Sequence, residues 1–133
     1  MCEPAEAPLR CLIVDDSAYF LEAAADLLQR EGLTVAGVAS AGADALRQAA
    51  ELHPDVVLVD IMLGHESGIE LARQLAAANP GGRPAIILIS THAEADFADL
   101  IQKAPVAGFV AKPDLSGSAI RRLIRDRPLA SGL

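Results

Sequence analysis

The 133-residue sequence is poor in the residues that mark several common classes of small protein. It has only two cysteines, Cys2 and Cys11, no tryptophan, and 3% aromatic residues. Two cysteines are too few for a disulfide scaffold, and no histidine stands at metal-ligand spacing from either of them. Scarce aromatic residues argue against a surface on which nucleic-acid bases would stack. The composition therefore excludes a disulfide-rich or zinc-bound module.

Long apolar runs and an excess of positive charge are also missing. No apolar run approaches the roughly 18 residues of a membrane span, and the start, MCEPAEAPLR, lacks the apolar stretch of a secretory signal. The balance of 11 Lys plus Arg against 18 Asp plus Glu gives a net charge of −7, which disfavours binding to a phosphate backbone. We expect a cytoplasmic domain that contacts neither membrane nor nucleic acid directly.

Five short apolar segments alternate with helical patterns along the chain. Strands are expected at residues 11–14, 34–39, 56–59, 85–89 and 108–111. Helices are expected after Ser17, at 43–52 and 69–78, and where the apolar residues Phe97, Leu100, Ile101 and Ala104 and then Ile120, Leu123 and Ile124 recur. Residues 62–68 contain two glycines and are expected to form a loop. Apolar strands without alternation indicate a sheet buried on both faces.

This alternation predicts an α/β fold, a doubly wound five-stranded parallel sheet of order 2-1-3-4-5. We expect one domain over residues 9–126, with flexible tails at 1–8 and 127–133. Polar residues follow the strands at their carboxyl ends: Asp15 and Asp16, Asp60, Ser90 and Thr91, and Lys112. In such a sheet, ligands bind outside the carboxyl ends of the strands where the strand order reverses, here between the first and third strands.

The two strands at that point are the ones that end in carboxylates. Three carboxylates that converge would repel each other without a cation, and their hard oxygen atoms suit Mg²⁺. A phosphoryl group on Asp60 would then meet a cation, the Lys112 ammonium and the Ser90 hydroxyl. A single Asp after a strand is usually a turn or capping residue, but the complementary set favours a site for phosphoryl chemistry.

At these residues the sequence resembles the response-regulator receiver domain of two-component signalling, which has a flavodoxin-like (CheY-like) fold. The resemblance runs from about Leu9 to Ile124. It rests on the spacing: 44 residues from Asp16 to Asp60, 30 from Asp60 to Ser90, and 22 from Ser90 to Lys112.

The resemblance implies a role for each residue of this set. Asp60 would be the phosphoacceptor, and Asp15 and Asp16 would bind Mg²⁺ together with Asp60 and the backbone carbonyl of Met62. Ser90 and Lys112 would grip the phosphoryl group, and Ser90 and Phe109 would form the switch. The side chains of Met62 and His92 would tune the rate of dephosphorylation, although His92 is as well explained as a solvated residue.

The resemblance also implies partners. A histidine kinase or phosphotransfer protein would donate the phosphoryl group from a phosphohistidine. An output partner would bind the surface of the fourth helix, fifth strand and fifth helix, and a phosphorylation-dependent dimer is among the alternatives. The domain would catalyse only its own phosphorylation and dephosphorylation and would not be a turnover enzyme.

One departure and several alternatives remain open. Where family members usually have proline four residues after the phosphoacceptor, this chain has Gly64, so a more flexible loop is expected. One alternative is a pseudo-receiver that signals without phosphate. Another, suggested by residues 54–60 together with Gly108 and Phe109, is the receiver part of a longer helix-turn-helix transcription factor. A phosphatase or phosphotransferase with an Asp nucleophile would need a substrate pocket for which 133 residues leave no room.

Overall fold

A five-stranded parallel sheet forms the centre of the computed structural model, which describes residues 9–79, 84–91 and 97–126. Its strands are β1 (Arg10–Val14), β2 (Thr34–Ala39), β3 (Val56–Asp60), β6 (Ala85–Ser90) and β7 (Gly108–Ala111). Their order is β2-β1-β3-β6-β7 and every pairing is parallel. In order along the chain these are strands 2-1-3-4-5, so the predicted α/β topology is confirmed.

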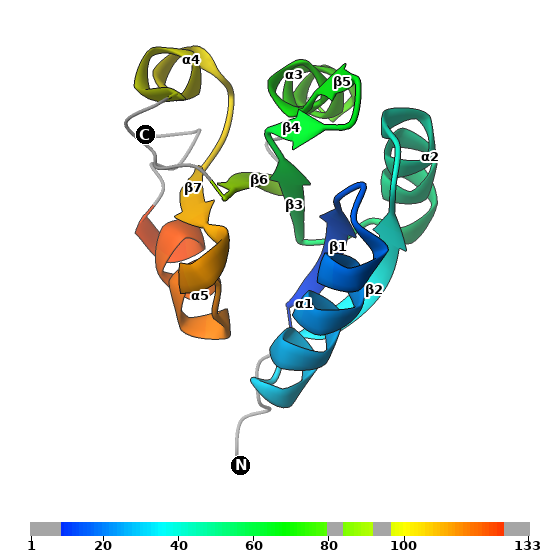
Figure 1. Cartoon of the computed structure of the whole chain (residues 1–133), viewed down its shortest axis with the longest axis vertical. Helices are drawn as coiled ribbons and strands as arrows, with labels where there is room; N and C mark the ends of the chain where they lie inside the picture. Colours follow the sequence, from blue (N-terminus) through cyan, green and yellow to red (C-terminus); the bar gives the residue numbers. More distant parts are fainter. Residues whose placement is uncertain (1–8, 80–83, 92–96, 127–133) are drawn as a thin grey trace.

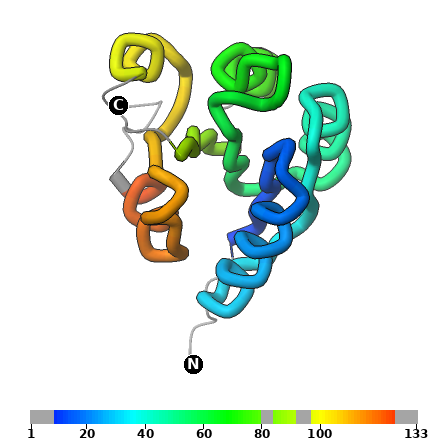
Figure 2. Tube along the Cα trace, viewed as in Figure 1, coloured from blue at the N-terminus to red at the C-terminus, as the bar shows by residue number. Residues whose placement is uncertain are grey.

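Five helices cover the two faces of the sheet (Figure 1). They are α1 (Ala18–Arg30), α2 (Gly42–Leu52), α3 (Gly68–Ala78), α4 (Ala98–Lys103) and α5 (Gly117–Asp126), and a short 3₁₀ helix, η2 (Lys112–Asp114), precedes α5. Alternate residues of each strand point to opposite faces, which separates the core into two clusters. One cluster joins the sheet to α2, α3 and α4, and the other joins it to α1 and α5. The Cα trace shows the two groups of helices on opposite sides of the sheet (Figure 2).

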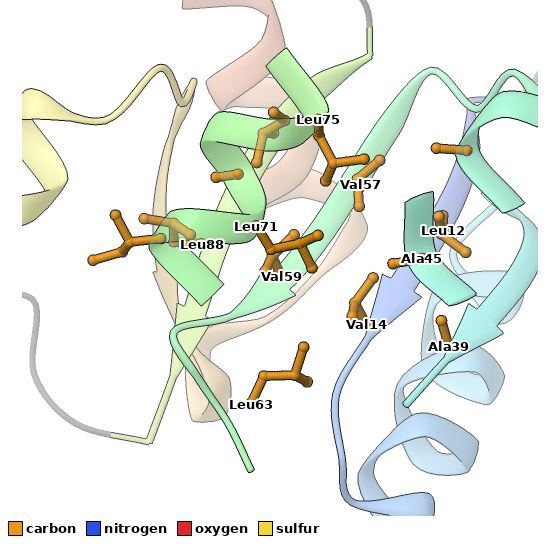
Figure 3. Close-up of a cluster of buried hydrophobic side chains, with 14 of the residues drawn as sticks. Leu12, Val14, Ala39, Ala45, Val57, Val59, Leu63, Leu71, Leu75 and Leu88 are labelled. Carbon is orange, nitrogen blue, oxygen red and sulfur yellow. The ribbon is translucent and has the colours of Figure 1, made fainter. Parts of the chain in front are cut away.

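Figure 3 shows the cluster under α2 and α3. Leu12 and Val14 of β1 and Val57 and Val59 of β3 pack there, with Leu75 of α3 among their neighbours. All five side chains are fully buried. Strands buried on both faces account for the continuous apolar runs of the sequence.

Capping groups fix where α1 begins and ends. The Ser17 hydroxyl accepts a hydrogen bond from Phe20 N at 3.2 Å, as expected for an N-cap serine. After Arg30 the chain turns through Gly32 at a φ of +94°, a conformation that favours glycine. The Ser17 cap therefore sets the direction in which α1 leaves the Asp15–Asp16 corner.

The structure corrects two expectations about helices and loops. Residues 62–68 are not an irregular loop: β4 (Met62–Leu63) and β5 (Glu66–Ser67) pair in an antiparallel hairpin whose two-residue turn has Gly64 at a φ of +61°. Glycine at this turn position suits a tight hairpin, and Leu63, 2% exposed, anchors it in the core. Leu100, expected on the buried face of the fourth helix, is 49% exposed. The short α4 packs against the core through Phe97 and Ile101 instead.

Some predictions fall outside the described residues. These are the flexible tails at 1–8 and 127–133 and the rate-tuning role of His92. Within the described part of the chain, no helix is long and apolar enough to cross a membrane.

Candidate functional site at the carboxyl end of the sheet

Three carboxylates meet at the carboxyl ends of β1 and β3. Asp15 follows Val14, whose partner on β3 is Val59, and Asp60 is the next residue after Val59. Oxygen atoms from Asp15, Asp16 and Asp60 all lie within 4.8 Å of one another. Asp15 is 0% and Asp60 6% exposed, whereas Asp16 is open to solvent. The sheet register therefore brings together the acidic residues that the sequence singled out.

Lys112 supplies the positive charge beside them. It follows β7, and its Nζ lies 2.5 Å from Asp15 Oδ2 and 3.2 Å from Asp60 Oδ2. The same Nζ lies 4.4 Å from the centroid of the Phe20 ring on α1. The Lys112 side chain is only 14% exposed. Two regions far apart in the sequence, residues 15–20 and the end of β3, thus hold one ammonium group from a third.

Backbone amides satisfy only part of the carboxylate oxygens. Asp15 Oδ1 accepts a hydrogen bond from Ser17 N at 2.8 Å, and Asp60 Oδ1 accepts one from Met62 N at 3.1 Å. Asp15 Oδ2 is buried and makes the ion pair with Lys112, but among the described residues no donor is aligned for a hydrogen bond to it. The Lys112 ammonium therefore offsets the charge of this oxygen, and no backbone amide among the described residues donates to it.

The electrostatics of the site follow from burial and from the neighbouring charges. Burial raises the pKa of Asp60, and the Asp15 charge raises it further, while Lys112 and the Met62 amide oppose the rise. For Lys112, burial lowers the pKa, but the neighbouring carboxylates of Asp15 and Asp60 outweigh burial, so its pKa is raised overall. The site therefore keeps Lys112 charged while it resists the accumulation of negative charge.

The donor set fits a divalent metal ion. Carboxylate oxygens from Asp15, Asp16 and Asp60 are hard ligands, and their close grouping is the arrangement that holds such an ion. The buried Asp15 Oδ2, without an aligned donor, is the atom that a cation would satisfy. Because Asp16 is exposed, the ion could enter and keep water ligands.

The other predicted site residues lie around this centre. Ser90 is the last residue of β6, next to β3, and is 1% exposed. Met62 is 55% exposed, and its backbone amide donates a hydrogen bond to Asp60. Phe109 on β7 is half-buried against the core cluster of α2, α3 and α4. Ser90 pairs with Ala111, the residue before Lys112, so hydroxyl and lysine arise at the same edge of the sheet.

Three residues contribute to the site without any local sequence signal for such a role. Phe20 contacts Lys112, as described above. Glu66 on the hairpin accepts a hydrogen bond from Gly42 N at the start of α2 at 2.7 Å. Gly68 begins α3, and a Cβ there would lie 1.9 Å from Asp60 O. The glycine lets α3 approach the end of β3, while Glu66 ties the hairpin to α2.

Comparison with known proteins decides what kind of site this is. Residues 11–124 match the response regulator receiver domain family. The chain belongs to this family. Its acidic site and lysine are those of a domain that signals through phosphoaspartate.

The receiver domain occurs in relatives of different kinds and lengths. A protein-glutamate methylesterase/protein-glutamine glutaminase from Symbiobacterium thermophilum is 35% identical over 134 residues, covering 98% of this chain and 36% of that protein. Chemotaxis protein CheY from Thermotoga maritima is 32% identical over 104 residues, covering 78% of this chain and 85% of CheY. The chain thus spans about a third of the methylesterases that it matches but most of CheY.

A solved structure agrees with the fold. The response regulator protein from Burkholderia pseudomallei, crystallised with a phosphorylated aspartic acid, a calcium ion and citrate, superposes with a TM-score of 0.76 at 25% identity. The match covers 89% of this receiver domain and 67% of that chain.

Proposed function

We propose that Asp60 accepts a phosphoryl group from the phosphohistidine of a histidine kinase or phosphotransfer protein, with Mg²⁺ bound by the acidic residues. The observation that carries this proposal is the placement of Lys112 Nζ within 3.2 Å of Asp60 Oδ2 beside two further carboxylates. A buried carboxylate next to a cation site and a fixed ammonium is suited to phosphoryl transfer.

In the proposed reaction, a carboxylate oxygen of Asp60 attacks phosphorus, the P–N bond to the donor imidazole breaks, and an acyl phosphate forms. Asp15, Asp16, Asp60 and the Met62 carbonyl would hold Mg²⁺, which offsets negative charge on the transferred group when it is bound. Lys112 and the Ser90 hydroxyl would bind the remaining phosphoryl oxygens. Hydrolysis by water would return Asp60 to its starting state, and the side chains of Met62 and His92 would tune that rate.

The same residues would convert phosphorylation into a change of surface. Ser90 would move toward the new phosphoryl oxygens, and Phe109, half-buried on β7, would turn further inward. Full burial of an aromatic side chain stabilises a state by roughly 1.5–3 kcal/mol, enough to shift a balanced two-state equilibrium by tenfold or more. We propose that α4, β7 and α5 form the surface that an output partner reads.

The length of the matched relatives indicates what kind of partner could read this surface. In the methylesterases, the chain corresponds to about a third of the protein, and in CheY to most of it. Either an attached output region or a separate protein, including a second copy of the domain, could read the surface. We propose that the domain acts in the cytoplasm, where phosphohistidine donors of two-component systems present their phosphoryl group.

Intact-mass spectrometry tests this function directly. The protein is incubated with acetyl phosphate and Mg²⁺, beside Asp60→Asn and a sample in EDTA. We expect the mass of one phosphoryl group to be added to the wild type in Mg²⁺ and to neither control. An Asp60→Asn variant that is phosphorylated to the wild-type level would place the acceptor elsewhere. A wild type that stays unmodified in Mg²⁺ would favour the pseudo-receiver alternative.

A further inference from the structure

We propose that Phe20 is a positioning residue for Lys112, and that its ring keeps the ammonium group at the phosphoryl site throughout the reaction. The proposal rests on the proposed function, because it takes Lys112 as the group that binds a phosphoryl oxygen. It adds a residue of α1 to a site otherwise built from the strand ends.

The contact itself has the geometry of a cation–π interaction. Lys112 Nζ lies 4.4 Å from the centroid of the Phe20 ring, within the roughly 6 Å over which a ring attracts an ammonium group. The Lys112 side chain is 14% exposed, so water screens the attraction little. A partly desolvated cation–π pair is stronger than one on the surface.

The ring is itself held in place. Phe20 N donates a hydrogen bond to the Ser17 hydroxyl at 3.2 Å, which fixes the backbone at the start of α1. The half-buried side chain packs against the core cluster that joins the sheet to α1 and α5. The Lys112 ammonium, in contrast, is carried on a flexible four-carbon chain that has no intrinsic preference for one direction. Phe20 is therefore a rigid surface against which a flexible lysine rests.

The other two contacts of Lys112 must change during the proposed reaction. Its Nζ lies 2.5 Å from Asp15 Oδ2, an oxygen that a bound cation would use, and 3.2 Å from Asp60 Oδ2, on the carboxylate that would carry the phosphoryl group. Neither change alters the Phe20 ring. The ring thus remains as the partner that limits how far Lys112 moves when it exchanges a carboxylate for a phosphoryl oxygen.

The contribution of the Phe20 ring can be measured with beryllofluoride, a mimic of the phosphoryl group. Calorimetry in saturating Mg²⁺ gives the affinity of each variant for beryllofluoride. Phe20→Leu keeps an apolar side chain but removes the ring, and we expect beryllofluoride to bind about 5- to 30-fold more weakly. Phe20→Tyr keeps the ring and should restore affinity to within about threefold of the wild type. Tyr19→Leu is the matched control, because it removes the neighbouring aromatic ring, 82% exposed, and should leave affinity unchanged.

Two further measurements separate positioning from a structural role. The affinity for Mg²⁺ alone should be unchanged or slightly higher in Phe20→Leu, because a less restrained lysine competes less for Asp15. General distortion of α1 would weaken Mg²⁺ binding as well. In a double-mutant cycle, Phe20→Leu should have little further effect once Lys112→Met has removed the ammonium group.

The outcomes distinguish this inference from the proposed function. Wild-type affinity for beryllofluoride in Phe20→Leu would overturn the positioning role and leave the function of Asp60 intact. An effect of Phe20→Leu that persists at full size in the Lys112→Met background, or that Phe20→Tyr fails to rescue, would also overturn it. A wild type that binds no beryllofluoride would overturn both.

Discussion

Aspartate and a basic residue meet at both ends of the same sheet, with opposite results. At the amino end, Arg10 begins β1, and Asp55 immediately precedes β3. Arg10 N donates a hydrogen bond to Asp55 Oδ2 at 2.9 Å, and Asp55 N donates one to Arg10 O at 2.8 Å. The Arg10 guanidinium also donates to the carbonyls of Leu52 and His53 at the end of α2. This corner is a closed set of complementary partners.

The carboxyl end also combines aspartates with a basic residue, Lys112, but it has an excess of negative charge. Three carboxylates share one lysine, and Asp15 Oδ2 has no aligned hydrogen-bond donor among the described residues. Burial and the Asp15 charge raise the pKa of Asp60. Structural hydrogen bonds satisfy their polar atoms, whereas functional sites leave charge and hydrogen-bonding capacity for a ligand. The contrast shows that pairing, and not residue type, distinguishes the two corners.

Replacing the basic residue at each end of the sheet should give the largest difference between the two ends, in phosphorylation rate and in free energy of unfolding. Lys112→Met should slow phosphorylation of Asp60 by acetyl phosphate about 100-fold or more, because a fixed positive charge on the phosphoryl oxygens is lost. Arg10→Met should leave that rate within about threefold but lower the free energy of unfolding by about 1–3 kcal/mol, since two helix-end carbonyls lose a donor. Intact-mass kinetics and urea unfolding measure the two effects. Equal loss of rate in both variants would contradict the division between the two ends.

Mg²⁺ should raise the free energy of unfolding by binding at the carboxyl end of the sheet and not at the amino end. At ten times its dissociation constant, a ligand that binds only the folded state adds about 1.4 kcal/mol to the free energy of unfolding. We expect this gain in the wild type and in Asp55→Asn, and its loss in Asp15→Asn. Thermal unfolding with Mg²⁺ and with EDTA measures it. The same gain in Asp15→Asn would show that the ion binds outside the acidic site.

The sequence allowed the strands and the charged strand ends to be predicted because both depend on local pattern. The continuous apolar run Val56–Val59 is followed directly by an aspartate, so the predicted end of the strand places Asp60 at the edge of the sheet. Parallel pairing then places all such ends at one edge of the sheet. Asp15, Asp60 and Lys112 could therefore be grouped before any contact between them was known.

The features that were not predicted depend on contacts between distant segments. Phe20 and Lys112 are 92 residues apart, and a position in the helix expected after Ser17 gives no sign of a contact with the end of the last strand. Glu66 reaches Gly42 N across 24 residues, with no local signal for a cap supplied from a hairpin. The hairpin itself has strands of two residues each, too short for an alternating pattern to show.

The smallest expected effect is one of stability, and it has opposite signs at the two ends. In EDTA at pH 7, Asp60→Asn should raise the free energy of unfolding by about 1 kcal/mol, because it removes a buried charge that Asp15 repels. Asp55→Asn should instead lower it, because the charged acceptor of the Arg10 backbone amide becomes a neutral amide oxygen, which accepts a weaker hydrogen bond. Urea unfolding of the two variants and the wild type gives both signs.

The pH dependence gives this last prediction a second, independent check. The pKa of Asp60 lies above its ordinary value of 3.8 in the folded protein, so between the two values the folded state binds more protons than the unfolded state. The free energy of unfolding that Asp60 contributes therefore falls as pH rises through this window, and Asp60→Asn lacks that fall. The raised pKa of Lys112 acts only at alkaline pH, where its stabilising contribution is lost as the lysine deprotonates. The advantage of Asp60→Asn should accordingly be small near pH 4 and reach a plateau by pH 7. An advantage of the same size at both pH values would mean that the introduced asparagine packs better than Asp60, and that repulsion within the acidic site does not limit stability.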